Sequence, residues 1–343
     1  MKKLLSYYRS ASQAVRASLW GTICNFLQRG AAFLVVPIFT RLLTEEQYGV
    51  CNVYFAWYEI FVLFTSLKLP YEGLNNGLIR HEKDKDGYAS AMMGLIVLMT
   101  GVCALLWWPL RRPVGRVTGL SDFLMTVMFV QLLFSPILNL WINRQRFDFK
   151  YRAAVVLTMI TTVVSPVIAI VAVLNTRYMA EARIISLAAV QTCLGLGCGL
   201  VLLLRGKKIF NKEYWGFALK FNLPLLCYYL SQSVLNQSDR IMINYFCGSG
   251  KAAVYSVAYT AGTLMLLAVS AIMGAFSPWM YRKLKAKEYS QVVPAAGRLT
   301  LLMAAATLVM TVFAPDLVAI LATDSYREAK CLSKNTTSKM SLF

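Results

Sequence analysis

Charged residues, and acidic residues in particular, are scarce in this chain of 343 residues. Only 15% of the residues are charged, Asp and Glu together number 16, and there is a single His. Soluble domains carry about 25% charged residues, so this shortage excludes a soluble enzyme, a disordered chain and a secreted disulfide scaffold. Hydrophobic residues make up 58% of the chain, and the mean hydropathy is +0.55. One soluble core cannot bury such an excess, which predicts a multi-pass membrane protein.

Motifs for metal, redox and nucleotide chemistry are also missing. The eight cysteines form no C-x-x-C pair, His81 stands alone in a charged segment, and no Walker motif occurs. The stretches between apolar runs are too short to hold a catalytic domain. We therefore expect no cofactor, no metal site and no enzymatic activity, and an ATPase would have to be a separate subunit.

Apolar runs long enough to cross a bilayer recur along the chain. A bilayer core of about 30 Å takes roughly 20 residues of helix. The runs do not alternate as the strands of a membrane barrel do, so we expect an all-α, polytopic transmembrane helix bundle. The nine predicted spans are residues 18–40, 47–69, 88–110, 121–141, 153–175, 183–204, 217–245, 252–280 and 293–314.

Lysine and arginine are distributed unequally between alternate loops. The N-terminal tail and each loop after an even-numbered span carry four of them, whereas the loops after odd-numbered spans carry one to three. Cytoplasmic loops are the ones enriched in Lys and Arg, so we expect a cytoplasmic N-terminus. The net charge of +19 is then a topology signal, and we expect no nucleic acid partner.

A weak internal repeat indicates two lobes. A shift of 204 residues places Tyr48–Phe55 on Ala252–Tyr259, which is typical of transporters with parallel repeats. We expect an N-terminal six-helix lobe (1–205), a partial C-terminal lobe of about three helices (206–322) and a polar tail (323–343). The tail has no apolar periodicity, so we expect a truncated or frameshifted product whose last residues are not native.

Polar and ionisable side chains inside the predicted spans are the candidate site residues, because such groups are costly in a membrane. Asn25, Gln28 and Arg29 share one face of the first span, and Glu59 lies in the middle of the second. The whole candidate set consists of Asn25, Gln28, Arg29, Glu59, Lys220, Asp239, Arg240 and Arg298. Cations in a water-filled cavity attract an anionic cargo, and Arg binds phosphate through a planar fork. The set therefore predicts a cavity for a pyrophosphate headgroup, with Glu59 or Asp239 as a counter-ion or proton site.

Structural roles for the same residues stay open at this point. Arg29 and Glu59 form a buried pair between two helices in one alternative. Lys220 and Arg298 extend to the lipid headgroups in another. Asp239 and Arg240 position the turn that follows them in a third. The segment after Pro70, with Glu72, is expected to be a solvated loop.

Three segments of the chain carry recognisable motifs: SLWGTICNFLQRGAAFLVVPIFTRLLTEEQYGVCNVYFAW (18–57), LPYEGLNNGLIRHEKDKDGY (69–88) and SDRIMINYFCGSGKAAVYSVAYTAG (238–262). They resemble the polysaccharide transport family, the Wzx-type O-antigen and capsule flippases of the superfamily that holds the MATE exporters and the lipid II flippase. Asp239 and Arg240 match the family motif directly, whereas Arg29 fits the family's cationic cavity more loosely. The resemblance covers about residues 1–330 and implies a MATE-like two-lobe bundle, whose second lobe is incomplete here.

The resemblance implies a flippase that moves undecaprenyl-pyrophosphate-linked oligosaccharide from the cytoplasmic to the periplasmic leaflet of the bacterial inner membrane by alternating access. Its partners would be this lipid-linked oligosaccharide, the bilayer and other polysaccharide assembly proteins. One rival is a cation-coupled multidrug exporter, whose cavity should favour carboxylates over the cations found here. Another is a membrane-embedded polysaccharide polymerase, which would need a sizeable outer loop or an acid/base pair.

Overall fold

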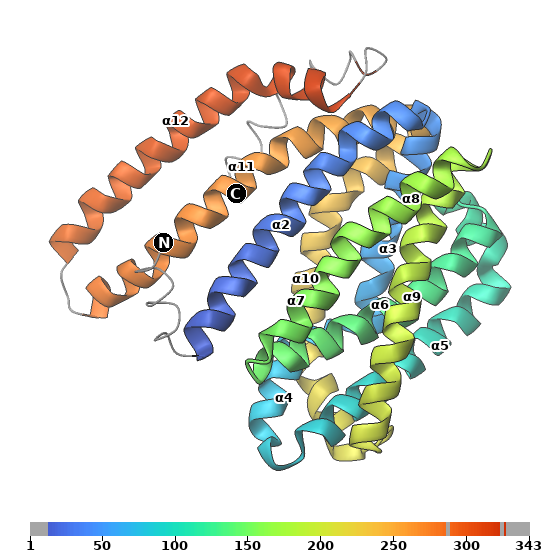
Figure 1. The fold of residues 1–343 in the computed structure, drawn as a ribbon, viewed down its shortest axis with the longest axis vertical. Helices are drawn as coiled ribbons and strands as arrows, with labels where there is room; N and C mark the ends of the chain where they lie inside the picture. Colours follow the sequence, from blue (N-terminus) through green and yellow to red (C-terminus); the bar gives the residue numbers. More distant parts are fainter. Residues whose placement is uncertain (1–12, 286–288, 323–325, 327–343) are drawn as a thin grey trace. The chain divides into compact units, whose positions relative to one another are not determined.

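The structure, a computed structural model, describes residues 13–285, 289–322 and 326, and these residues form helices without a strand (Figure 1). Each predicted span coincides with a helix or with a helix that is broken along its length. The all-α polytopic bundle is therefore confirmed. The helices are α2 (Gln13–Leu42), α3 (Glu45–Ser66), η1 (Leu69–Gly73), α4 (Leu74–Arg80), η2 (Glu82–Asp84), α5 (Lys85–Thr118), α6 (Asp122–Phe147), α7 (Tyr151–Met159), η3 (Ile160–Val164), α8 (Ser165–Leu174), α9 (Met179–Gly206), α10 (Lys212–Cys247), α11 (Ser249–Lys285) and α12 (Tyr289–Leu321).

Several of these helices are suited to a membrane by length and composition. Five helical stretches among the described residues are long and apolar enough to cross a bilayer. The number rises to six when α3 and the segment Leu69–Arg80, which is bent from it by 42°, count as one broken span. Helices α2, α10 and α11 coincide with predicted spans but are not in this set, so their crossing stays a prediction.

The chain divides into two compact units. Unit 1 consists of Met1–Ala32 and Val50–Gly248, and unit 2 of Phe33–Gly49 and Ser249–Phe343. These units are defined by contacts within each, whereas the predicted lobes divide at residue 205, and the lobe boundaries stay a prediction. Of the predicted polar tail, only Tyr326 lies within the described residues.

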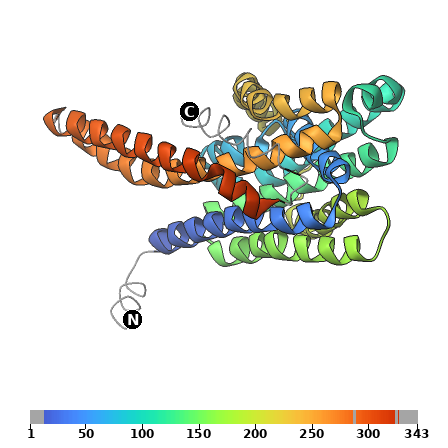
Figure 2. The ribbon, with the colours of Figure 1, turned by 90° about the horizontal axis from the view of Figure 1, so that it is seen from above.

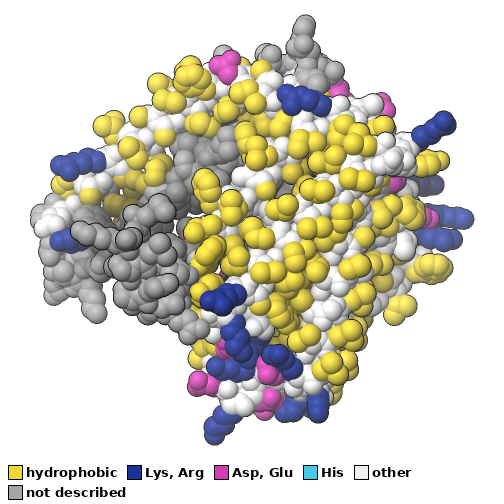
Figure 3. Space-filling model, in the orientation of Figure 1, with side chains coloured by type: hydrophobic (Ala, Val, Ile, Leu, Met, Phe, Trp, Pro, Cys, Tyr) yellow, Lys and Arg dark blue, Asp and Glu magenta, His cyan; other side chains and the backbone are white. Residues whose placement is uncertain are grey.

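Unit 1 is built around α6 and α9, which pack along each other and against α5. Its apolar core lies around α4 and the first turns of α5, and it includes Leu74, Leu78, Tyr88 and Met92, all fully buried. Apolar side chains cover much of the face over α7, α8 and α9, while Lys and Arg gather toward the end that carries α4 and again along the right edge of the view (Figure 3). An apolar surface next to a charged end is what a bilayer and its headgroups require.

Polar side chains start the helices of unit 1 where the chain turns. The Asp84 carboxylate accepts a hydrogen bond from the Gly87 N–H at the start of α5, at 3.1 Å. The Asn211 side chain accepts from the Glu213 and Tyr214 N–H groups at the start of α10. Such caps satisfy N–H groups that have no partner within the helix. They therefore fix where each turn ends and the next helix begins.

Two segments depart from the sequence expectations. The stretch after Pro70 is helical, as η1 and α4, and not a loop, although Glu72 is exposed as expected. The fifth predicted span is interrupted by the π-helical turn η3, which separates α7 from α8. Pro166 follows this turn and has no N–H to donate, so the regular hydrogen-bond ladder cannot continue through it.

In unit 2, α11 and α12 run side by side (Figures 1 and 2). The Thr40 hydroxyl, at the end of α2, donates to the carbonyl of Leu321 at 2.7 Å and so satisfies a carbonyl at the end of α12. The start of α3 also approaches the start of α11 closely, because a Cβ added to Gly49 would lie 1.9 Å from the Ser249 carbonyl oxygen. The predicted repeat placed these two helix starts in register, and the repeat itself stays a prediction.

Candidate functional site

The predicted cavity residues are spread over several helices and both units. Gln28 is half-buried and Arg29 is exposed on α2, while the side chain of Asn25 lies outside what the structure describes. Glu59 on α3 is exposed, and a pair of Arg29 with Glu59 stays a prediction.

The remaining predicted residues lie on α10 and α12. On α10, Lys220 and Asp239 are exposed, and the half-buried Arg240 donates to the Gln237 side-chain oxygen one turn away at 3.2 Å. Arg298 is exposed on α12 and belongs to unit 2, whereas Lys220, Asp239 and Arg240 belong to unit 1. A single cavity that joins all these residues stays a prediction.

A break in the second span shapes the end of unit 1. Leu67 and Lys68 adopt left-handed backbone angles (φ 48° and 53°), and Pro70 follows. Non-glycine residues rarely adopt such angles, so the break needs support from its surroundings. Asn143 on α6 supplies part of that support, because its amide donates to the Pro70 carbonyl at 2.9 Å. The break thereby turns α4 toward the end of α6.

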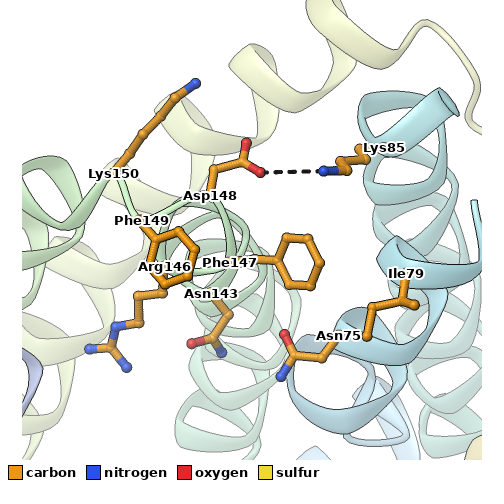
Figure 4. A pocket seen from close by; sticks show the side chains of 9 residues that line it. All are labelled: Asn75, Ile79, Lys85, Asn143, Arg146, Phe147, Asp148, Phe149 and Lys150. Carbon is orange, nitrogen blue, oxygen red and sulfur yellow. Dashed lines mark ion pairs between the residues drawn. The ribbon is translucent and has the colours of Figure 1, made fainter. Parts of the chain in front are cut away.

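The space between α4 and the end of α6 is a pocket of about 890 Å³, which we call the basic pocket. Figure 4 shows Lys85 facing Asp148 and the amides of Asn75 and Asn143 pointing toward one another, while Arg146 and Lys150 extend away from them in different directions. The lining residues are Asn75, Ile79, Lys85, Asn143, Arg146, Phe147, Asp148, Phe149 and Lys150.

The basic pocket carries an excess of positive charge. Its only carboxylate, Asp148, lies 3.9 Å from Lys85 and also accepts a hydrogen bond from Arg144. Among the ion pairs between described residues, none includes Arg146 or Lys150. Two cations on exposed positions therefore remain to attract an anion, and the Arg146 guanidinium offers the fork geometry that suits a phosphate.

Ion pairs hold the turns next to the basic pocket together. Arg144, whose side chain is only 9% exposed, contacts Asp86 at 3.0 Å as well as Asp148. Lys208, after α9, pairs with Asp84, and the Tyr214 hydroxyl donates to the same carboxylate at 2.8 Å. The hydrogen bond and the charge of Asp84 raise the pKa of Lys208, so this pair stays charged throughout the physiological range. The starts of α5 and α10 and the ends of α6 and α9 are thus joined at one end of unit 1.

A buried polar chain crosses the apolar helices of unit 1, and the sequence analysis missed it. The Tyr54 hydroxyl donates to the Gln131 side-chain oxygen at 2.8 Å, and the Gln131 amide donates to the Gln191 oxygen at 2.9 Å. These residues come from α3, α6 and α9, and Tyr54 and Gln131 are almost fully buried. Glutamine in an apolar span was the available signal, because uncharged polar groups in a membrane also need partners. A prediction based on ionisable groups alone does not include this chain of hydrogen bonds.

The described residues contain no cluster of three or more His, Cys, Asp or Glu side chains placed to hold a metal ion. The seven described cysteines are not joined in disulfides. The basic pocket offers a ligand charged groups, side-chain amides and aromatic rings.

Comparisons with known proteins identify the family and the fold of this chain. The model of the family described as polysaccharide biosynthesis protein matches residues 14–283, and no curated protein sequence matches the chain. The fold is similar to the solved structure of a multidrug resistance MATE family transporter of the MOP superfamily in an inward-facing conformation. That likeness has a TM-score of 0.61 at 13% sequence identity and covers 92% of this chain and 78% of the other. The matched residues include almost the whole of unit 1, so the chain belongs to the polysaccharide biosynthesis protein family and is a multi-pass membrane protein with a MATE-like fold.

Proposed function

We propose that this protein is a transporter that moves an undecaprenyl-pyrophosphate-linked oligosaccharide from the cytoplasmic to the periplasmic leaflet of the inner membrane by alternating access. The basic pocket is the observation that supports this proposal, and the family of the chain is named for polysaccharide biosynthesis. The loops that line the pocket follow the second and fourth predicted spans. The distribution of Lys and Arg predicts that these loops are cytoplasmic. The pocket would then face the compartment in which such a cargo is made.

The chemistry of the pocket suits a pyrophosphate that carries a sugar. Arg146 can donate two parallel hydrogen bonds to one phosphate, and Lys150 adds a second positive charge. The Asn75 amide can serve hydroxyl groups as donor and acceptor, and Phe149 presents an exposed ring. Because Lys85 is engaged by Asp148, we assign the anion to Arg146 and Lys150.

The in-span residues form the next part of the proposed path. Arg29, Lys220, Arg240 and Arg298 would hold the headgroup in the cavity during transfer, while Glu59 or Asp239 acts as a counter-ion or a proton site. Gln28 and Asn25 extend the polar face around Arg29 on α2. Cations outnumber acids in this set, as they do in the basic pocket, so both favour an anionic cargo.

A cation-coupled drug exporter is the second candidate, because a multidrug transporter has the same fold. A site for cationic drugs needs free carboxylates, whereas the carboxylate of the basic pocket is engaged by Lys85 and Arg144. A test with two probes of opposite charge separates these functions.

Farnesyl pyrophosphate is a suitable anionic probe, because it carries the headgroup of the proposed cargo on a short chain. We expect it to bind the purified full chain in nanodiscs, and we expect the double variant Arg146→Gln/Lys150→Gln to weaken this binding by roughly tenfold or more. Lys212→Gln, which removes an exposed cation outside the pocket, is the matched control and should bind as the native chain does. Equal binding by the native chain and the double variant, or stronger binding of a cationic dye than of farnesyl pyrophosphate, would contradict the proposal.

A further inference from the structure

A second pocket of unit 1 differs from the basic pocket in its chemistry. It is a groove of about 510 Å³ on the membrane-spanning helices, which we call the apolar groove. Its lining is almost entirely apolar, with one charged side chain, and it shares no residue with the basic pocket. The lining residues are Trp141, Arg152, Ala153, Val156, Leu157, Cys193, Leu194, Gly197, Cys198 and Val201.

The groove forms where two halves of a broken span follow different neighbours. Helix α7 packs on α6, whereas α8, beyond the π-helical turn, packs closely on α9. A small core cluster that includes Ile142 and Ala154 forms the bottom of the space between α7 and α9. Gly197 keeps the α9 wall open, because a Cβ added there would have no atom within 4 Å.

The length of the groove matches one leaflet of a membrane. On α9 its lining extends from Cys193 to Val201, which is about 12 Å at the rise of an α-helix. Half of a bilayer core of about 30 Å is about 15 Å. An acyl chain of one leaflet therefore fits along the groove.

The single cation of the groove lies at one end of it. Arg152 stands in the first turn of α7, and its lining neighbour Val156 is one turn further into the helix. Arg152 is exposed, and no ion pair between described residues includes it. An Arg at the end of an apolar slot is complementary to a lipid phosphate, which lies at the membrane surface above its acyl chains.

We propose that the apolar groove binds an anionic phospholipid of the surrounding bilayer, with one acyl chain between α7 and α9 and its phosphate on Arg152. The occupant is a resident lipid and not the transported molecule, because the groove is about one leaflet deep and is apolar except for Arg152 at its end. The proposal rests on the groove alone and does not depend on the identity of the cargo.

Native mass spectrometry of the purified full chain tests the proposal with two lipids of identical acyl chains. Dioleoyl phosphatidylglycerol should be retained more than dioleoyl phosphatidylcholine. Arg152→Gln should lower the retention of phosphatidylglycerol by roughly tenfold, to the level of phosphatidylcholine. Gly197→Leu should fill the groove and lower the retention of both lipids.

Matched controls distinguish the groove from the rest of the surface. Gly101→Leu places the same side chain on α5, where a Cβ also meets nothing within 4 Å, and Arg112→Gln removes an exposed Arg that does not line the groove. Both should retain phosphatidylglycerol as the native chain does. Equal retention of the two lipids by the native chain, or equal losses in Arg152→Gln and Arg112→Gln, would overturn the proposal.

The unmodified chain supplies a second measurement that does not depend on how a variant folds. Cys193 lines the groove and is exposed, whereas Cys227 on α10 is also exposed but does not line it. Phosphatidylglycerol should slow the reaction of Cys193 with a maleimide by severalfold and leave Cys227 unchanged, as peptide mapping can measure. Protection of Cys193 by farnesyl pyrophosphate but not by phosphatidylglycerol would assign the groove to the cargo and overturn the proposal.

Discussion

Arg144 shows at the scale of one residue how a topology signal can also be a structural link. The sequence analysis counted it among the cations of a loop, because it follows an apolar run and precedes other basic residues. The structure buries it at the end of α6, between Asp86 and Asp148. Burial of one cation among several depends on which carboxylates the folded turns bring near it, and composition does not contain that information.

Replacement of Arg144 should destabilise unit 1. Arg144→Gln leaves two carboxylates close together without their shared cation. Loss of one partner of a buried pair typically costs about 3–5 kcal/mol, and we expect about 2–3 kcal/mol here because Asp86 is half exposed. Thermal unfolding in detergent, followed by tryptophan fluorescence, measures the effect. Lys85→Gln removes a weaker contact of Asp148 at 3.9 Å and should cost at most about 1 kcal/mol, so equal losses in the two variants would contradict this account.

The chain from Tyr54 through Gln131 to Gln191 should be coupled energetically. Gln131→Leu leaves the Tyr54 hydroxyl and the Gln191 oxygen without their partner in an apolar interior, which we expect to cost about 1–2 kcal/mol. In the Gln131→Leu background, Tyr54→Phe should cost less than it does in the native chain, because the hydroxyl no longer has its acceptor. A double-mutant cycle measured by unfolding provides the test, and purely additive losses would contradict the coupling.

At the scale of helices, the close approach of α9 to α6 depends on a small residue. Helix α9 packs on α6 through Gly195, where an added Cβ would lie 2.4 Å from the backbone oxygen of Phe134. Gly197, two residues further along, faces the open apolar groove. Both glycines appear identical in the sequence, and only the packing of α9 assigns them different roles.

Alanine substitutions at these two glycines should have opposite effects. Gly195→Ala forces α6 and α9 apart against a backbone atom that cannot rotate away, and overpacking of this kind typically costs about 1–3 kcal/mol. Gly197→Ala meets no atom and replaces a poor helix former, so stability should be unchanged or slightly higher. Unfolding midpoints of the two purified variants are the measurement, and a similar loss in both would show that the α6 contact does not limit the residue at 195.

The long helices could be predicted from the sequence, whereas the paths of the broken spans could not. Apolar length placed every long helix, because roughly 20 apolar residues have few other uses. The break at Pro70 was visible, but the helical path beyond it was not, since it depends on hydrogen bonds such as that from Asn143. The turn η3 (Ile160–Val164) had Pro166 as its only signal, because the apolar run continues on both sides of the turn.

At the scale of the whole molecule, composition predicted a polytopic helical membrane protein, and motif resemblance predicted the family that the chain belongs to. The basic pocket was not predicted, because its residues lie in turns that the sequence analysis used only to orient the chain. Ionisable residues within spans received the attention instead, and their assembly into one cavity stays a prediction. Sequence patterns predicted the spans, but they could not predict the pocket that the folded turns form.

Orientation in the membrane is the property of the whole molecule on which the proposed direction of transport depends. Each loop after an even-numbered span is rich in Lys and Arg, so the segment around Lys83 should be cytoplasmic and the turn before Lys251 periplasmic. Both side chains are exposed, and native Cys247 is exposed close to Lys251. In cells with a permeabilised outer membrane, an impermeant maleimide should therefore label Lys251→Cys and Cys247, and it should label Lys83→Cys only after the inner membrane is opened. Labelling of Lys83→Cys alone in cells with an intact inner membrane would reverse the topology, and the basic pocket would then face the periplasm and receive a cargo after transfer instead of before it.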